Sequence, residues 1–286
     1  MTTTDYDAFA ANWRLIGNAA DTCTNYLRCV KRLPVAVDGA TYTDIAAHLA
    51  KRAEVMSASQ MQFEVRSFRA FFSWRADHYD TTNPAAKLKT VKVPEMPVRA
   101  VTESEHQALV RQCAGLTLLD RRDRGLLCVL WSTGMRRSEL ARIELDRIEL
   151  DHLDMEAQTV TIPRTKTGKA RTVGLDNDSV RALRRYLAVR QRHKHARSPY
   201  LWLGHRGILS SDGVRQMIKE RADAGGCPGI GAHTYRRALA ERWLRASGSE
   251  SLLRAYAGWS SPAMVARYVR SNSQALALTE HRRLLG

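Results

Sequence analysis

Hydrophobic positions in the first 92 residues recur every three, four or seven residues, the spacing of an α-helix with one buried face. The strongest stripe lies in Met61–Tyr79 and consists of Met61, Val65, Phe68, Phe72 and Tyr79. Weaker stripes predict helices over Thr22–Leu33 and Asp44–Met56. Asn83-Pro84 ends the third helix, since proline breaks helical hydrogen bonding. This part of the chain is therefore predicted to be all-helical.

Beyond residue 98 the hydrophobic positions mainly have helical spacing. One region instead alternates between apolar and polar residues, as a β-strand does. A capping box at Thr102–Glu105 begins a helix through Val110, and Asp123–Trp131 predicts another that breaks at Ser132-Thr-Gly134. Gln158–Pro163 and Ala170–Leu175 alternate on either side of a polar turn, which predicts a β-hairpin. From Ser179 the pattern is helical again, with stops at Pro199, Gly225-Gly226, Gly248 and Gly258. The predicted fold is mainly α with a small β-sheet.

A proline-containing segment divides the chain into two predicted domains. Pro94 and Pro97 forbid a continuous helix, so residues 93–98 are interpreted as a linker between residues 1–92 and 99–286. In the tail, Ser271–Gln274 predicts a short break, followed by a helix with apolar Leu276, Leu278, Leu284 and Leu285. This tail, residues 271–286, could pack on its own domain or on a neighbouring protomer.

Charge is the informative property of the composition. The formal net charge is +16 and the pI is near 10.1. Residues 1–98 carry 12 basic and 10 acidic side chains, whereas residues 99–286 carry 33 and 19. Such a balance favours a polyanionic partner, with nucleic acid the first choice. An anionic membrane surface or a merely basic protein stays open on charge alone.

Other features of the composition exclude several classes. No apolar run reaches 18 residues, which argues against a membrane span, and the N-terminus does not have the pattern of a secretory signal. The five cysteines form no CxxC pair, which argues against a zinc site or a disulfide framework. A cytoplasmic protein is expected.

Four scattered segments carry side chains that could act on a phosphate. Arg136 and Glu139 follow the turn at Gly134, Lys166 lies at the hairpin tip, and His233 and Arg236 lie in the first turn of a helix. The fourth segment begins a helix at Ser261-Pro262 and contains Trp259 and Tyr268. Taken singly, these could be a surface ion pair, a polar turn, a helix cap and a core tyrosine.

Together the four segments resemble the tyrosine recombinase, or phage integrase, family. Thr-Gly-Met-Arg136-Arg-Ser-Glu139-Leu resembles its first arginine box, Thr-Lys166-Thr-Gly its hairpin lysine, and His233-Thr-Tyr-Arg236 its His-x-x-Arg box. Trp259 stands where the family has His or Trp, and Tyr268 follows nine residues later. Residues 22–86 are similar to the family's helical core-binding domain. The resemblance is to a Cre- or Xer-like member without an extra arm-binding domain.

The resemblance implies a site-specific recombinase that cleaves DNA through a 3′-phosphotyrosyl intermediate, with no metal and no cofactor. Tyr268 would be the nucleophile, and Arg136 and Arg236 would hold the phosphate oxygens. Lys166 would be the general acid, and His233 would accept the tyrosine proton or donate to the phosphate. Trp259 would donate its indole N–H, and Glu139 would orient Arg136 or Lys166. The side chains expected to contact DNA are Lys51, Arg52, Arg66, Arg69, Arg164 and Lys169.

The implied partner is double-stranded DNA with inverted-repeat core sites. The chain would be a monomer when free and a homotetramer on two DNA sites, with an accessory directionality or host factor possible. A phage or mobile-element integrase is the leading interpretation, and a Xer- or Cre-like dimer resolvase is the alternative. A catalytically silent DNA-binding protein of the same fold and a type IB topoisomerase are the rivals.

Overall fold

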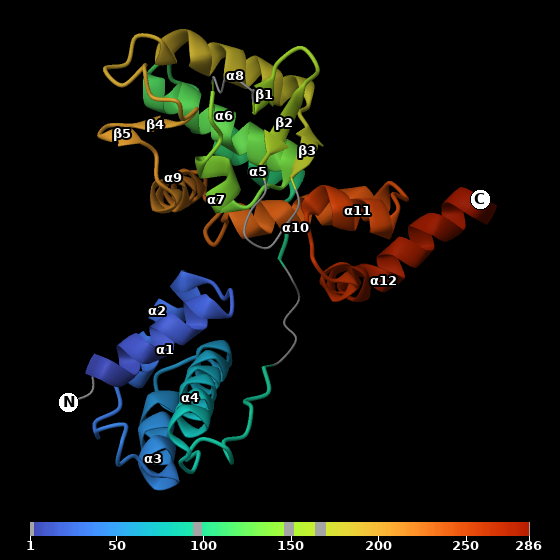
Figure 1. The fold of residues 1–286 in the computed structure, drawn as a ribbon. Helices are drawn as coiled ribbons and strands as arrows, with labels where there is room; N and C mark the ends of the chain where they lie inside the picture. Colours follow the sequence, from blue (N-terminus) through green and yellow to red (C-terminus); the bar gives the residue numbers. More distant parts are fainter. Residues whose placement is uncertain (1–2, 94–98, 146–151, 164–169, 286) are drawn as a thin grey trace. The chain divides into compact units, whose positions relative to one another are not determined.

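The computed structural model describes residues 3–93, 99–145, 152–163 and 170–285, without the side chains of 3, 4, 267–276, 279 and 280. The chain divides into two compact units, Met1–Met96 and Pro97–Gly286. Figure 1 shows the elements of each unit. Of the described helices, none has both the length and the apolar character that crossing a bilayer requires.

The first unit is a cluster of helices around α4. Its described elements are α1 (Thr3–Leu15), α2 (Ala20–Val30), α3 (Tyr42–Ala53) and α4 (Ala58–Tyr79). Capping boxes begin two of them, since Thr41 pairs with Asp44 and Ser57 pairs with Gln60. The three expected helices are present, and α1, which we did not predict, adds Phe9 to the aromatic core around Phe68, Phe71 and Phe72.

The second unit is mainly helical and contains two small sheets. Its described helices are α5 (Glu103–Arg111), α6 (Leu118–Thr133), α7 (Arg137–Ala141), α8 (Asn177–Arg190), α9 (Ser211–Ala224), α10 (Ala232–Arg245), α11 (Glu250–Ala257) and α12 (Pro262–Leu285). The strands are β1 (Leu153–Asp154), β2 (Thr159–Ile162), β3 (Arg171–Gly174), β4 (Leu203–Gly204) and β5 (Gly207–Ile208). The mainly α fold class is confirmed.

The predicted hairpin is the antiparallel pair β2–β3, which places Ile162 opposite Arg171. β1 extends this sheet on the other side of β2. The pair β4–β5 was not predicted, because two-residue strands leave no alternation to detect. Gly207 has φ +115° between them, a conformation that side chains disfavour.

The expected break at residues 271–274 is wrong, because α12 runs without interruption from Pro262 to Leu285. Ser, Asn and Gln cost only a few tenths of a kcal/mol each relative to alanine in a helix, roughly 0.7 kcal/mol at most. Beyond Pro262 at its first position, the helix contains no glycine or proline that would end it. Its first turns pack on α10 and α11 through buried Val265.

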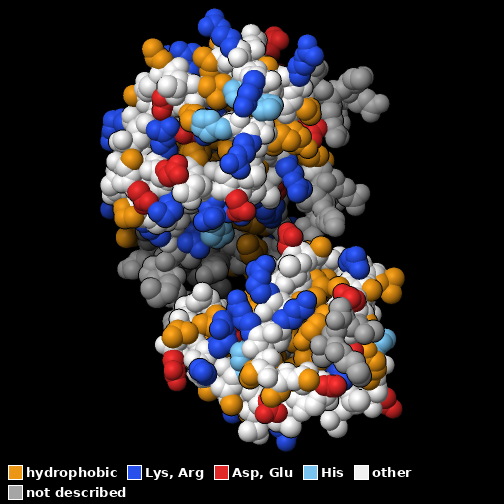
Figure 2. Space-filling view, turned by 90° about the vertical axis from the view of Figure 1, so that its left-hand side faces the viewer, with side chains coloured by type: hydrophobic (Ala, Val, Ile, Leu, Met, Phe, Trp, Pro, Cys, Tyr) orange, Lys and Arg blue, Asp and Glu red, His pale blue; other side chains and the backbone are white. Residues whose placement is uncertain are grey.

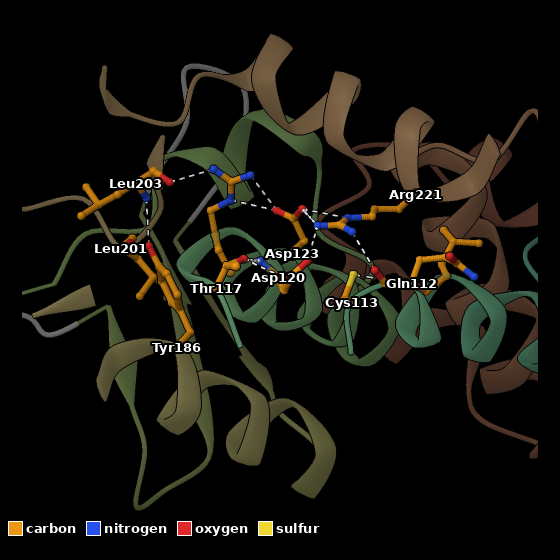
Figure 3. Close-up of polar contacts among 11 residues, drawn as sticks. Gln112, Cys113, Thr117, Asp120, Asp123, Tyr186, Leu201, Leu203 and Arg221 are labelled. Atoms are coloured by element: carbon orange, nitrogen blue, oxygen red, sulfur yellow. Dashed lines mark hydrogen bonds and ion pairs between the residues drawn. The ribbon is translucent and has the colours of Figure 1, made fainter. Parts of the chain in front are cut away.

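A buried ion network holds α9 against α6 (Figure 3). The Asp123 carboxylate accepts hydrogen bonds from Arg122 at 2.7 Å and from Arg221 at 2.8 Å. Arg122 also donates to the Leu203 carbonyl, and Arg221 donates to that of Gln112. Each buried charge is thus paired and hydrogen-bonded, as burial of a charge requires. The network fixes the position of α9, whose basic side chains line the candidate site.

A second buried cluster makes the unit sensitive to acid. The His106 ring stacks on Trp131 and shares a 3.3 Å hydrogen bond with the Tyr235 hydroxyl. Burial, with the nearby Arg242 cation, lowers the pKa of His106 from 6.5 to about 4. The unfolded chain therefore binds a proton between pH 6.5 and 4 that the folded chain does not. Stability falls as the pH decreases through that window, by about 3 kcal/mol in all.

We expect His106→Phe to remove this dependence while it keeps the stacking on Trp131. The measurement is the urea midpoint of both proteins at pH 7.5, 5.5 and 4.5, because other groups titrate equally in both. The difference between the urea midpoint of the wild type and that of His106→Phe should shrink or reverse as the pH falls. If the urea midpoints of the two proteins changed in parallel with pH, His106 would not titrate as described.

Candidate active site

A hollow of about 680 Å³ lies between the beginning of α7, the beginning of α10, the loop before α10, and α9. Cationic and histidine side chains dominate its polar lining, namely Arg136, Arg137, Arg215, Lys219, His233 and Arg236, with Asp223 as an acidic member. Three of these were predicted as site residues, and they come from segments about a hundred residues apart. The hollow is therefore a site for an anion, because several donors converge on it.

The turn between α6 and α7 presents Arg136 at the hollow. Gly134 ends α6 with φ +57°, and a Cβ there would lie 2.7 Å from the Leu239 side chain. The Arg136 backbone N–H donates to the Glu139 carboxylate at 2.9 Å, and its guanidinium donates to the same carboxylate at 2.8 Å. Arg136 therefore precedes α7 rather than sharing a helix face with Glu139, and about two fifths of its side chain stays exposed.

Arg236 is buried in the first turn of α10, and it joins three segments. Its guanidinium donates to the Gly134 carbonyl at 3.0 Å and to the Ala257 carbonyl. It also lies 5.0 Å from the centre of the buried Trp259 ring, within the range of a cation–π contact. The fork of an arginine suits such a position, since it can bind several acceptors in fixed directions. Arg236 thus couples the α6–α7 turn to the end of α11.

The Glu139 carboxylate lies between two guanidinium groups. Its side chain is 2% exposed, and besides Arg136 it accepts two hydrogen bonds from Arg171 on β3, at 3.2 and 2.8 Å. Burial raises the pKa of Glu139, but the hydrogen bonds from Arg171 and Arg136 outweigh that effect, and the pKa lies below its ordinary value. Glu139 is therefore an anion that fixes Arg136.

Several predicted residues lie outside the described part of the chain. Lys166 falls there together with Arg164 and Lys169. Tyr268 lies in α12, six residues after Pro262, and its side chain is among those not described. His233 lies exposed in the first turn of α10, as the spacing predicted, and it lines the hollow.

The predicted DNA contacts of the first unit lie in two separate hollows. Arg66 and Arg69 line one of about 590 Å³, between α4 and residues 83–90. Lys51 and Arg52 line another of about 640 Å³. The Arg52 guanidinium donates at 2.7 Å to both oxygens of buried Glu64, so its charge is largely balanced. Figure 2 shows basic side chains on the visible face of each unit, interspersed with acidic and apolar ones.

Sequence reasoning missed Arg137 and two side chains of α9, Arg215 and Lys219, as lining residues. All three pair with acidic residues of α9, Arg215 and Arg137 with Asp212 and Lys219 with Asp223. No motif marks Arg215 or Lys219, and Arg137 stands inside the first arginine box without a role assigned to it. The amphipathic pattern of Ser211–Ala224 predicts a helix. Which face of that helix lines the hollow depends on tertiary contacts such as the hydrogen bond from Arg221 to Asp123.

Comparisons with known proteins agree with this geometry. The model of the phage integrase family matches residues 99–275. The chain belongs to the phage integrase family. It is 28% identical to the tyrosine recombinase XerC of Ralstonia pickettii over 237 residues, which cover 78% of this chain and 72% of that protein. It is 24% identical to the tyrosine recombinase XerA of Pyrococcus furiosus over 275 residues, which cover 94% and 90%.

The fold is shared with solved structures of the same class. The Tn1549 transposon integrase in complex with transposon right end DNA superposes with a TM-score of 0.74 at 17% identity, over all of both chains. The family match and the named relatives confirm the expected tyrosine-type, site-specific DNA recombinase, and the shared fold agrees with the expected fold class.

Proposed function

We propose that this recombinase cleaves and rejoins DNA at the hollow on the second unit, through a 3′-phosphotyrosyl intermediate. The observation that carries the proposal is the convergence of Arg136, His233 and Arg236 on one hollow. Arg236 also contacts Trp259, which stands nine residues before Tyr268 and three residues before the helix that bears it.

The reaction conserves the energy of the phosphodiester. The Tyr268 hydroxyl attacks the phosphorus, the bond to the 5′-oxygen breaks, and the new phosphotyrosyl ester can be attacked in turn by a 5′-hydroxyl. Arg136 and Arg236 would hold the non-bridging oxygens, on which charge develops in the transition state. His233 would exchange the tyrosine proton, and Lys166 would protonate the departing 5′-oxygen. Such proton transfer contributes about 10²–10⁴-fold.

The test is an adduct assay. The protein is incubated with a nicked suicide duplex that carries the inverted repeats found beside its gene, in EDTA, and the products are separated on a denaturing gel. A covalent protein–DNA band supports the proposal. DNA binding without an adduct at any time would favour the catalytically silent alternative. Supercoil relaxation without exchange between two sites would favour a topoisomerase.

Both units would contact the duplex. The unit Pro97–Gly286 would supply most of the phosphate affinity, because residues 99–286 carry the larger excess of basic side chains. In the unit Met1–Met96, Arg66 and Arg69 are the better candidates, because Glu64 engages Arg52. The hairpin residues Arg164 and Lys169 would reach the DNA beside Lys166.

Integration of a mobile element is our first candidate for the biological role. Xer-like resolution of dimers is the second, and the names of the curated relatives favour it. A test plasmid that carries two copies of the site in direct repeat distinguishes these two roles. Resolvase activity deletes the interval between identical sites, whereas an integrase requires two different sites and proceeds in one direction.

We also propose that α12 mediates assembly of a tetramer on two DNA sites. The end of α12 exposes apolar side chains that its own chain does not cover. Their exposed fractions are 52% for Leu278, 61% for Leu284 and 78% for Leu285. Deletion of residues 272–286 is expected to leave single-site binding and to abolish recombination between two sites. Leu278→Glu with Leu284→Glu should do the same with the helix intact. Undiminished recombination by both variants would refute the role of α12.

A further inference from the structure

Arg171 occupies a place that no motif marks, on the strand β3 that follows the hairpin tip. Its side chain is 13% exposed and makes three kinds of contact. Two of its nitrogens bind the Glu139 carboxylate, and Nε donates to the Tyr256 carbonyl at 2.9 Å. Its guanidinium also lies against Gly258, where a Cβ would be 2.7 Å from Nη1.

The contacts of Arg136 and Arg171 form one closed network. Arg136 donates to the Gly258 carbonyl at 2.8 Å, so the two arginines hold the same turn at the end of α11 and share one carboxylate. Gly258 has φ +64° and ends α11, and Trp259 follows it directly. A side chain at residue 258 would displace Arg171 and strain the turn.

Charge gives this arrangement a consequence for phosphate binding. A lone Arg136–Glu139 pair is neutral, and a neutral pair attracts a phosphate less than a free guanidinium does. Arg171 adds a second positive charge to the same buried carboxylate. The three side chains together carry +1, and the exposed part of Arg136 faces the hollow.

We propose that Arg171 is a positioning residue of the recombinase, which neutralises Glu139 so that the charge of Arg136 remains available to the scissile phosphate. The inference rests on the proposed role of Arg136. Arg171 does not contact the DNA in this scheme. It acts through Glu139 and through the turn that carries Trp259.

The test compares the effect of Glu139→Gln on cleavage in two proteins, the wild type and Arg171→Met. Arg171→Met is expected to slow single-turnover cleavage of the suicide duplex about 10- to 100-fold, the loss that follows removal of a partner that orients a metal ligand, because Arg171 acts on Arg136 in the same indirect way. Glu139→Gln should slow cleavage in the wild-type background, because Arg136 loses the carboxylate that fixes it. In the Arg171→Met background the same substitution should raise the rate, because it releases Arg136 from an uncompensated anion.

Arg171→Lys separates charge from geometry. It keeps the positive charge but not the fork that binds Glu139 and Tyr256 together, and its rate should lie between those of wild type and Arg171→Met. Arg181→Met is the matched control, since Arg181 is 62% exposed on α8 and pairs with Asp178. Melting temperatures are recorded for every variant, and rates are compared well below them.

The outcomes separate this inference from the proposed function. No adduct with wild type would overturn the proposed function itself. An adduct with wild type and an equal rate for Arg171→Met would overturn only the role of Arg171. A merely structural role predicts that Glu139→Gln lowers the rate by the same factor in both backgrounds, and that result would also refute the inference.

Discussion

Arg236→Gln is expected to slow single-turnover cleavage about 10³-fold, at the upper end of what one preorganised donor to a transition state contributes. Glutamine cannot present a charged fork to a phosphate. It also leaves the carbonyls of Gly134 and Ala257 without their buried donor and removes the cation from the Trp259 ring. Two unsatisfied buried groups cost about 1–3 kcal/mol each, so the free energy of unfolding should fall as well.

The two effects can be separated by temperature and by a matched arginine. Arg245→Gln removes an exposed guanidinium from the end of the same helix and should change neither cleavage nor stability measurably. Arg236→Lys keeps the charge and loses the fork, so cleavage should stay strongly impaired even where the protein is fully folded. Cleavage by Arg236→Gln within tenfold of wild type, on folded protein, would remove Arg236 from the phosphate site.

Local pattern predicted the segments of the site well. The turn at Gly134, the hairpin strands and the helix after Gly231 depend on residues within a few positions of one another, and each has the expected type in the structure. The sequence pattern did not predict the continuous α12, because the polar run after Tyr268 resembles a loop although its cost in a helix is low.

Contacts between segments could not be predicted in the same way. Nothing in the alternation of β3 distinguishes Arg171 from the other polar residues of the hairpin. Its importance arises when β3 is brought beside Glu139 and the end of α11. The pairing of Arg52 with Glu64 is similar, since two helices must pack before the charge of a predicted DNA contact is seen to be balanced. Sequence yields the chemical groups, and packing determines which of them remain available.

Tyr268 is the proposed nucleophile. Tyr268→Phe removes one hydroxyl from a chain of net charge +16, so DNA affinity and its salt dependence should be unchanged. Adduct formation should fall at least about 10⁴-fold, because without the hydroxyl no covalent bond to phosphorus can form. Tyr42→Phe, at a tyrosine that is 47% exposed in the first unit, is the control and should cleave normally.

Isolation of the linked peptide makes the assignment unambiguous. After digestion of the wild-type adduct with trypsin and nuclease, the nucleotide-bearing peptide should be the one between Arg267 and Arg270, which contains Tyr268 as its sole hydroxyl-bearing residue. A modified peptide from any other segment would move the nucleophile elsewhere, even if Tyr268→Phe were inactive. Agreement of both results is therefore required, because a lost hydroxyl can also disable a site indirectly, whereas a covalent bond marks the attacking atom itself.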